Sequence, residues 1–360
     1  MAMVDSASYP LTDLTPRRSQ AKQSKNIESL QAARGIAAVL VAICHSAAFI
    51  GEEPGLWHRV PIYVWLRGTA LGVQLFFVIS GIVIYRAHRK DFDQPSKVGV
   101  FYWKRFRRIY PLYWIFLSLT LLKHRALADV ASSYQRLPSV IVSSYVLIHL
   151  FSYQTIMVQA WSLFDEIQFY VVFAICILNR KAGFAFLAIW LSASVLFLTT
   201  SSPYRYVVFS PYHLLFGLGI LVAVALDADL QIPAALLSWL GVVVFIAAIV
   251  GTGPFYRGAA VRLIGGVGAA SILLGTAVLE RQNRLSIPRW LIVLGDASYS
   301  IYLVHFMVIS AVARFGYGHM RQLPIPIWGW MLCLMVSGVV MGIVAHYWVE
   351  RPLLRLFGKQ

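Results

Sequence analysis

The chain has 360 residues, of which 59% are hydrophobic and only 13% charged, and its formal net charge is +16. Together with a mean hydropathy of +0.69, this composition excludes a water-soluble globular domain and predicts an all-α integral membrane protein. The positive charge lies in segments between apolar runs, so no nucleic-acid partner is expected, and three cysteines scattered in apolar runs suit neither a disulfide framework nor a zinc site.

In chain order, a polar tail over 1–27 comes first and lacks the apolar stretch of a signal peptide. A membrane domain is expected over 28–353, followed by a short tail over 354–360. A run at 139–153 is too short for a span and is expected to be re-entrant or interfacial. Ten longer apolar runs predict a bundle of about ten transmembrane helices: 35–50, 70–85, 109–122, 163–178, 182–199, 207–226, 234–251, 260–279, 291–313 and 326–348.

The lysines and arginines predict the orientation of these spans. If ten helices alternate and both termini face the cytoplasm, the inner segments hold 20 of the 31 basic residues and the outer segments hold 10, with Arg34 at the boundary. This bias follows the positive-inside rule. The predicted inner loop 86–108 carries a concentration of arginines and lysines immediately before a span. These basic residues either set the membrane topology and contact anionic lipids, or bind a polyanionic cytosolic ligand.

Four polar residues fall in the predicted outer half of the bundle, where ionisable groups are costly and therefore candidates for a functional site. His45 belongs to the first span, Gln74 to the second, and Asp165 and Glu166 to the fourth. A histidine beside a carboxylate is the usual general-base arrangement, because the carboxylate fixes the tautomer and stabilises the imidazolium. Singly, each residue also has a structural explanation: His45 as a satisfied core histidine, Glu166 as the partner of an arginine.

A second group of polar residues lies near the predicted cytoplasmic face. Arg34 lies eleven residues before His45 and on the same helix face, about 16 Å away along the axis. The stretch "LGDASYSIYLVH" (294–305) opens the ninth span, with Ser298, Tyr302 and His305 on one face. The sequence therefore predicts an anion-binding mouth inside and a base-like cluster further out.

Five motifs in order resemble the membrane-bound acyltransferase family 3. An arginine and a histidine separated by ten residues occupy the first span, in "ARGIAAVLVAICHS". "FFVISG" (76–81), "RFRRIYPLYW" (105–114), "WSLFDEIQFY" (161–170), and "SYSIYLVH" (298–305) with a final "ERP" follow. The resemblance spans nearly the whole chain, and the opening stretch is most similar to the exopolysaccharide O-acetyltransferase-like branch.

The resemblance implies an enzyme of the bacterial inner membrane that moves an acyl group, usually acetyl, from cytosolic acyl-CoA to a sugar hydroxyl of a polysaccharide or lipid-linked acceptor. No metal and no permanently bound cofactor are expected, and homo-oligomer formation is left open. The implied catalytic residues are His45, Glu166, Arg34 and Asp165, with Glu350 also part of the signature. The residues expected to bind acyl-CoA are Arg34, Arg105, Arg108, Tyr110, Ser298, Tyr299, Tyr302 and His305, and those expected at the acceptor are Gln74, Trp161 and Tyr170.

The sequence departs from the family at one position, because Gln74 stands where relatives often have an acid. Asp165 or Glu166 is then expected to orient His45, unless the amide of Gln74 suffices. His45 acts either as a general base for direct transfer or as an acyl-accepting residue. Gln74, Ser80 and Tyr302 are the candidates for stabilising the oxyanion.

Two further function classes fit the ten spans. A transporter or flippase for a sugar or lipid-linked glycan would also use polar groups at mid-membrane, but no internal repeat is found, and Pro111 and Pro352 are expected at helix ends. A non-catalytic membrane subunit of a polysaccharide assembly complex explains the spans but not a pairing of His45 with Glu166.

"GGVGAAS" (265–271) is interpreted as close helix packing and not as a phosphate-binding loop.

Overall fold

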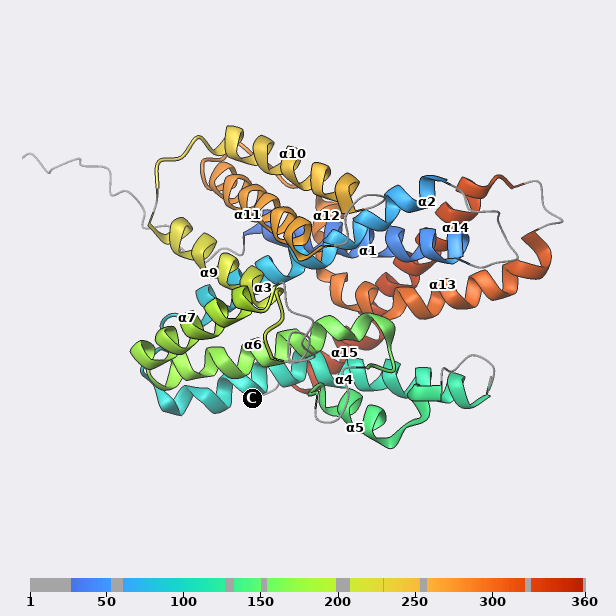
Figure 1. Cartoon of the computed structure of the whole chain (residues 1–360), viewed down its shortest axis with the longest axis horizontal. Coiled ribbons are helices and arrows are strands. Elements are labelled where there is room, and N and C mark those ends of the chain that lie inside the picture. Colours follow the sequence, from blue (N-terminus) through green and yellow to red (C-terminus); the bar gives the residue numbers. More distant parts are fainter. Residues whose placement is uncertain are drawn as a thin grey trace, which may run out of the picture.

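The computed structural model describes residues 27–52, 61–126, 133–149, 154–198, 208–228, 230–252, 258–320 and 325–358. In these described residues the chain is a bundle of helices without a β-strand (Figure 1). This confirms the predicted all-α architecture. Most of the predicted N-terminal tail, residues 1–26, lies outside the described part.

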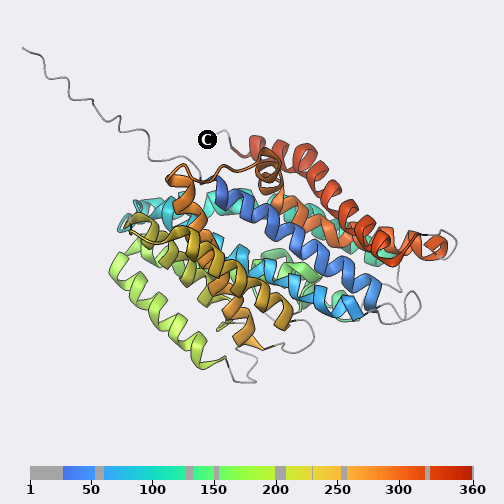
Figure 2. The ribbon, with the colours of Figure 1, turned by 90° about the horizontal axis from the view of Figure 1, so that it is seen from above.

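Ten of the helices in the described residues are long, and they lie roughly side by side when the bundle is seen from two directions (Figures 1 and 2). These are α1 (Glu28–Glu52), α3 (Gly72–His88), α4 (Val98–Ala126), α6 (Trp161–Leu178), α7 (Arg180–Leu196), α9 (His213–Asp227), α10 (Ala234–Thr252), α11 (Ala259–Arg281), α13 (Ser298–Met320) and α14 (Ile327–Ala345). The shorter elements are α2 (Pro61–Leu66), η1 (Arg67–Leu71), η2 (Pro95–Lys97), η4 (Ser133–Arg136), α5 (Pro138–Val146), η5 (Val158–Ala160), α12 (Arg289–Asp296), the π-helical turn η6 (His346–Glu350) and α15 (Arg351–Leu356).

Within the described residues, seven stretches have the length and hydropathy to cross a membrane, which supports an integral membrane protein. They are Glu28–Gly51, Tyr63–His88, Val158–Leu178, Ala234–Thr252, Ala259–Arg281, Ser298–Gly316 and Ile327–Leu356. The other three predicted spans lie in α4, whose first half is strongly basic, and in α7 and α9, which are 17 and 15 residues long. Ten spans and cytoplasmic termini therefore remain predictions. The run 139–153 contributes the nine-residue α5, which is too short to span.

The predicted inner loop 86–108 is largely helical, which corrects its assignment as a loop. Helix α3 ends at His88 and α4 begins at Val98, so the arginines of "KRFRR" lie on the first turns of α4 and not in a flexible segment. Pro111 lies inside α4, contrary to the expected position at a helix end. Arg105 and Arg108 are therefore three residues apart on a rigid helix and share one of its faces.

Helix α1 runs through the bundle and contacts α3, α12, α13 and α14. Glycines allow neighbouring helices to approach closely elsewhere. A Cβ atom on Gly81 of α3 would lie 2.2 Å from the carbonyl oxygen of Phe216 in α9, and one on Gly268 of α11 would lie 2.8 Å from the backbone nitrogen of Phe245 in α10. Only glycine permits these crossings. The interpretation of "GGVGAAS" as close helix packing is confirmed.

Candidate active site

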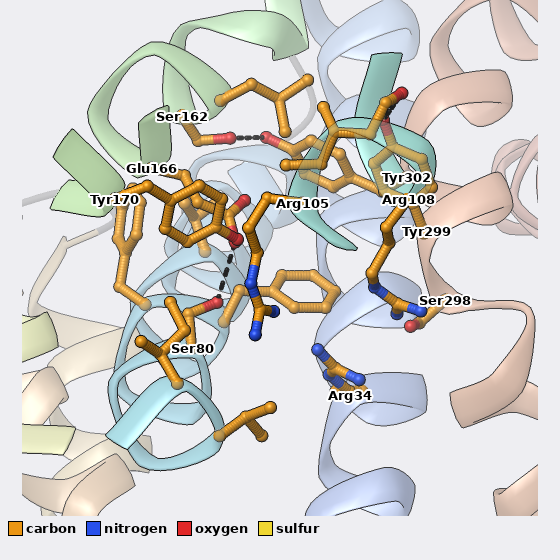
Figure 3. Close-up of a pocket in the computed structure, with 17 residues that line it drawn as sticks. Arg34, Ser80, Arg105, Arg108, Ser162, Glu166, Tyr170, Ser298, Tyr299 and Tyr302 are labelled. Carbon is orange, nitrogen blue, oxygen red and sulfur yellow. Dashed lines mark hydrogen bonds between the residues drawn. The ribbon is translucent and has the colours of Figure 1, made fainter. Parts of the chain in front are cut away.

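Three cavities follow one another through the bundle and share lining residues. A narrow cavity of about 80 Å³, here called the neck, lies between α1, α3, α4, α6 and α13 (Figure 3). Arg34 and Arg108 also line a larger cavity of about 850 Å³, the basic vestibule, at the N-terminal end of α1. Val73 and Tyr302 also line a cavity of about 620 Å³ that contains His45, here called the histidine cavity. A ligand that enters at the vestibule therefore has a route toward His45.

Three arginines meet in the neck without carboxylate partners. Figure 3 shows Arg34 from α1 and Arg105 and Arg108 from α4 converging on the same space. Within the described residues none of them lies within 4.0 Å of a carboxylate oxygen. Three unpaired guanidinium groups close together repel one another, so the neck favours an anionic ligand.

Arg105 is held in place by a histidine and by aromatic rings. Its Nη2 atom donates to Nε2 of His88 at 3.0 Å, while Nδ1 of His88 donates to Asp91 at 2.7 Å. The guanidinium carbon lies 5.7 Å from the ring centre of Phe101 and 5.6 Å from that of Tyr170. Its Nε atom is buried without a hydrogen-bond partner in the described residues, which leaves a donor for a ligand.

Glu166 lies in the neck and not beside His45. Its Oε1 atom accepts hydrogen bonds from the hydroxyl of Ser80, at 3.2 Å, and from the hydroxyl of Tyr170 (Figure 3). Tyr302 bridges the two adjoining cavities, where its hydroxyl lies 2.7 Å from both the backbone oxygen of Gln159 and the hydroxyl of Ser162. Tyr170, which was expected at the acceptor, therefore belongs with the neck residues.

His45 pairs with another histidine. Its Nδ1 atom lies 3.1 Å from Nε2 of His305 and 3.1 Å from the carbonyl oxygen of Val41. The Nδ1 atom of His305 lies 2.9 Å from the carbonyl oxygen of Ile301. Neither Asp165 nor Glu166 contacts His45 within the described part of the chain, so the expected carboxylate partner is replaced by His305.

These contacts fix the protons of both rings when they are neutral. A carbonyl oxygen only accepts, so Nδ1 of His305 carries a hydrogen and its Nε2 is an acceptor. Nδ1 of His45 is then the donor to that nitrogen and to Val41. The remaining nitrogen of His45, Nε2, holds a lone pair, and His45 lines the histidine cavity. This is the tautomer that a general base requires.

Three other predicted residues line the histidine cavity with His45: Gln74, Trp161 and Asp165. The carboxylate of Asp165 lies 3.4 Å from Nε2 of the buried His213, and this pair is separate from His45. The amide nitrogen of Gln74 can donate to the carbonyl oxygens of Ala70 and Leu71, at 3.2 and 3.1 Å. Gln74 is therefore committed to its own helix turn and does not orient His45.

The predicted acyl-CoA residues divide between the neck and other places. Ser298 and Tyr299 line the neck with the arginines, and the Tyr299 hydroxyl donates to Ile109 at 2.8 Å. His305, expected near the cytoplasmic face, lies beside His45 instead. Glu350 is largely buried at the lining of the vestibule, where its Oε2 atom accepts from the hydroxyl of Ser300 and from Nδ1 of His346, both at 2.7 Å.

Tyr110 does not line the neck, the vestibule or the histidine cavity. Its hydroxyl donates to the carbonyl of Val146 at 2.8 Å, while Tyr113 and Trp114 donate to other carbonyls at the end of α5. The last carbonyls of a helix lack partners within it, so this aromatic row caps α5. The expectation that Tyr110 binds acyl-CoA is therefore not supported by its position.

Sequence reasoning missed Gln159, which lines the histidine cavity from the short element η5. Its Nε2 atom donates to the carbonyl of Leu303 at 2.8 Å, and its buried Oε1 atom has no hydrogen-bond partner in the described residues. Gln159 precedes the recognisable motif "WSLFDEIQFY" and follows an irregular segment, so no periodicity marked it.

Comparison with known proteins agrees with this geometry. A family model described as an acyltransferase domain matches residues 27–347. The chain belongs to this acyltransferase family. It is the family suggested by the sequence motifs, and the match covers the neck, the histidine cavity and most of the vestibule lining.

Two curated proteins resemble the chain over most of its length. The exopolysaccharide production protein ExoZ of Rhizobium meliloti (strain 1021) is 29% identical over 313 residues, which cover 79% of this chain and 90% of that protein. The acyltransferase MdmB of Streptomyces mycarofaciens is 26% identical over 376 residues, covering 93% of both chains. No solved structure matches the chain.

Proposed function

We propose that the protein is an O-acyltransferase that moves an acyl group, in the first place acetyl, from cytosolic acyl-CoA to a hydroxyl of a cell-surface or lipid-linked polysaccharide. It acts in the bacterial inner membrane, with ten spans and both termini in the cytoplasm. The exopolysaccharide-related name of one relative supports the acceptor class, and the acyltransferase family supports the reaction.

One observation carries the proposal: unpaired arginines and a base-like histidine lie along one line of adjoining cavities. Arg34 and Arg108 line both the vestibule and the neck, and guanidinium groups suit phosphate, which supports entry of the CoA phosphates by this route. Arg34 and His45 lie on one face of α1, about 16 Å apart by helix rise. This separation suits a donor whose phosphates and reactive thioester are joined by the long pantetheine arm.

The reaction follows from the tautomer of His45. Its Nε2 atom takes the proton of the acceptor hydroxyl while the hydroxyl oxygen attacks the thioester carbonyl carbon. The carbon–sulfur bond then breaks, the new ester forms, and the proton passes from His45 to the departing CoA thiolate. His305 and the carbonyl of Val41 hold the ring of His45 through Nδ1 throughout.

The neck supplies two candidates for stabilising the negative charge on the thioester oxygen. The hydroxyl of Tyr302 lies between the neck and the histidine cavity, and the hydroxyl of Ser80 lies within the neck. Gln74, the third sequence candidate, has its amide hydrogens directed to its own helix. We propose Tyr302 for this role because it lines the junction of the two cavities. Its hydroxyl donates to the backbone oxygen of Gln159 in this structure, so it must exchange that acceptor for the thioester oxygen during the reaction.

The proposal is tested with purified protein in nanodiscs and radiolabelled acetyl-CoA. CoA release and label transfer to isolated cell-surface polysaccharide or its lipid-linked precursor are compared between wild type and His45→Ala. We expect both activities in wild type and neither above background in the variant. Label found on glycan identifies the acceptor class. Absence of CoA release and of transfer with several acyl-CoAs, in protein shown to be folded, contradicts the enzyme proposal and directs the next assay to glycan flux in proteoliposomes.

The same assay separates direct transfer from an acyl-histidine. Direct transfer gives no burst of CoA when acceptor is absent, whereas acylation of His45 releases one CoA per enzyme and leaves label on the protein. We expect no burst.

A further inference from the structure

A fourth cavity lies beside the histidine cavity and has a different charge. This side cavity, of about 230 Å³, is formed by α1, α4, α13 and the segment before α6. Three basic residues line it: Lys123, His124 and Arg314. No carboxylate is among the described residues that line it. The Nδ1 atom of His124 is buried there and has no hydrogen-bond partner in the described part of the chain.

Two residues connect the side cavity to the candidate active site. Phe306 lines the side cavity and also packs edge-on against the ring of His45, with ring centres 5.3 Å apart. Gln159 lines both cavities, and its buried Oε1 atom lacks a partner. A buried amide oxygen without a partner is costly, and a sugar hydroxyl would satisfy it.

The histidine cavity also contains a cation held at an aromatic wall. Trp161 and Tyr212 pack with ring centres 4.7 Å apart, and the apolar face of a sugar ring can pack on such a wall. The Nη1 atom of Arg262 donates to the hydroxyl of Tyr212 at 2.5 Å, which fixes the guanidinium at the cavity. Arg262 has further N–H donors and no carboxylate within ion-pair distance in the described residues.

The only carboxylate in the described lining of the histidine cavity, Asp165, is buried and forms no ion pair with Arg262 in the described residues. Asp165 lies 3.4 Å from the buried His213, which lies behind it and against Trp190. The surroundings of His45 are therefore positive on two sides, with Arg262 in one cavity and Lys123 and Arg314 in the other. Uncompensated positive charge beside a binding site favours an anionic ligand.

We infer that the acceptor is an acidic glycan, whose sugar carboxylates bind Arg262 and the Lys123–Arg314 side cavity while a neighbouring hydroxyl meets His45. Gln159 accepts a hydrogen bond from the sugar between these cationic groups. This inference rests on the proposed function and adds the charge of the acceptor to it. Charge-assisted hydrogen bonds to carboxylates are directional, so they also select which hydroxyl reaches His45.

The test uses the full-length protein in nanodiscs and a defined pair of probes. One probe is an oligosaccharide of alternating glucose and glucuronic acid, and the other is the same oligosaccharide after its carboxylates have been reduced to alcohols. Binding is measured by calorimetry at low ionic strength. His45-dependent CoA release is measured on the same wild-type preparation with isolated cell-surface polysaccharide as acceptor, so failure of the acyltransferase proposal is distinguished from failure of this inference.

We expect the acidic probe to bind at least tenfold more tightly than the reduced probe, and more weakly as salt is raised. Arg262→Gln and Lys123→Gln should each weaken binding of the acidic probe about tenfold and leave the reduced probe unchanged. Arg284→Gln removes the same charge at an exposed position in the segment that follows α11 and should behave as wild type. Gln159→Leu should weaken both probes equally.

Equal binding of the two probes overturns the inference, as does wild-type affinity of the acidic probe in both charge variants. Binding of neither probe overturns it as well when CoA release is intact. A polyprenyl diphosphate is included as a third probe, and charge-dependent binding of that compound alone overturns the assignment to sugar carboxylates. Acetyl-CoA binding with the wild-type Kd shows that each variant is folded, because the arginines proposed to bind acetyl-CoA line the neck and the vestibule and not the side cavity.

Discussion

The neck and the histidine cavity adjoin each other but are built in opposite ways. In the neck, three arginines face a single carboxylate, Glu166, and Arg34 and Arg108 form no ion pair in the described residues, so the neck carries an excess of positive charge that an anion would balance. In the histidine cavity, His45 is fixed through one ring nitrogen by His305 and Val41, and its other nitrogen remains available. Under the proposed function the first region binds the donor and the second carries out the reaction, so mutations in the two should alter different kinetic constants.

The largest effect short of removing His45 is expected from Arg108→Gln. Loss of a charge-assisted hydrogen bond to phosphate, worth about 1.5–3 kcal/mol, should raise the Kd for acyl-CoA about 10- to 100-fold. Turnover at saturating acyl-CoA should change little. The matched control is Arg107→Gln, which removes the same charge from the preceding residue of α4. Arg107 does not line the neck or the vestibule. Equal effects of the two substitutions would show that only general surface charge matters.

His305→Ala should give the converse result. Without its acceptor nitrogen the ring of His45 loses one of two restraints, and kcat should fall about tenfold while KM for acyl-CoA stays unchanged. His305→Gln retains a hydrogen-bond acceptor on the side chain and should recover part of the loss. A rise in KM with unchanged kcat would instead place His305 in acyl-CoA binding, as its motif suggested.

Arg34→Lys tests whether Arg34 binds a phosphate or only anchors α1. Lysine keeps the charge and loses the planar fork, so the Kd for acyl-CoA should rise about three- to tenfold if the guanidinium contacts phosphate. Direct binding of labelled acyl-CoA provides the measurement. Unchanged affinity and unchanged activity would leave Arg34 with the anchoring role alone.

Tyr110→Phe should have the smallest effect. The substitution removes the hydrogen bond to the end of α5, which contributes about 0.5–1.5 kcal/mol to stability. Thermal unfolding in detergent should therefore begin at a slightly lower temperature, while KM for acyl-CoA remains at the wild-type value. An increased KM with normal stability would restore Tyr110 to the acyl-CoA site.

The sequence was most informative where helical spacing alone determines proximity. The spacing of Arg34 and His45 on α1, and of Ser298 and Tyr302 on α13, correctly predicted which residues follow the line of cavities. The spacing did not predict how far α13 is displaced along α1. His305 consequently lies beside His45, although its motif suggested the cytoplasmic side.

Contacts that depend on irregular segments could not be predicted. Gln159 reaches two cavities from a single 3₁₀ turn, and Asp165 pairs with a histidine 48 positions further along the chain that carried no motif. The basic segment before "IYPLYW" resembled a loop because its charges interrupt the hydropathy pattern. Its backbone continues as α4, and the helix presents Arg105 and Arg108 to the neck.

The central claim is that acyl-CoA binds at the arginines and reacts at His45. The most direct measurement compares acetyl-CoA binding, and CoA release in the presence of polysaccharide acceptor, in the same nanodisc samples of wild type, His45→Ala and Arg108→Gln. The account predicts that His45→Ala binds acetyl-CoA normally but releases CoA about 10²–10⁴-fold more slowly, since a positioned base contributes about that factor. It predicts weakened binding with near-normal saturated turnover for Arg108→Gln. Near-wild-type turnover in His45→Ala would contradict the claim.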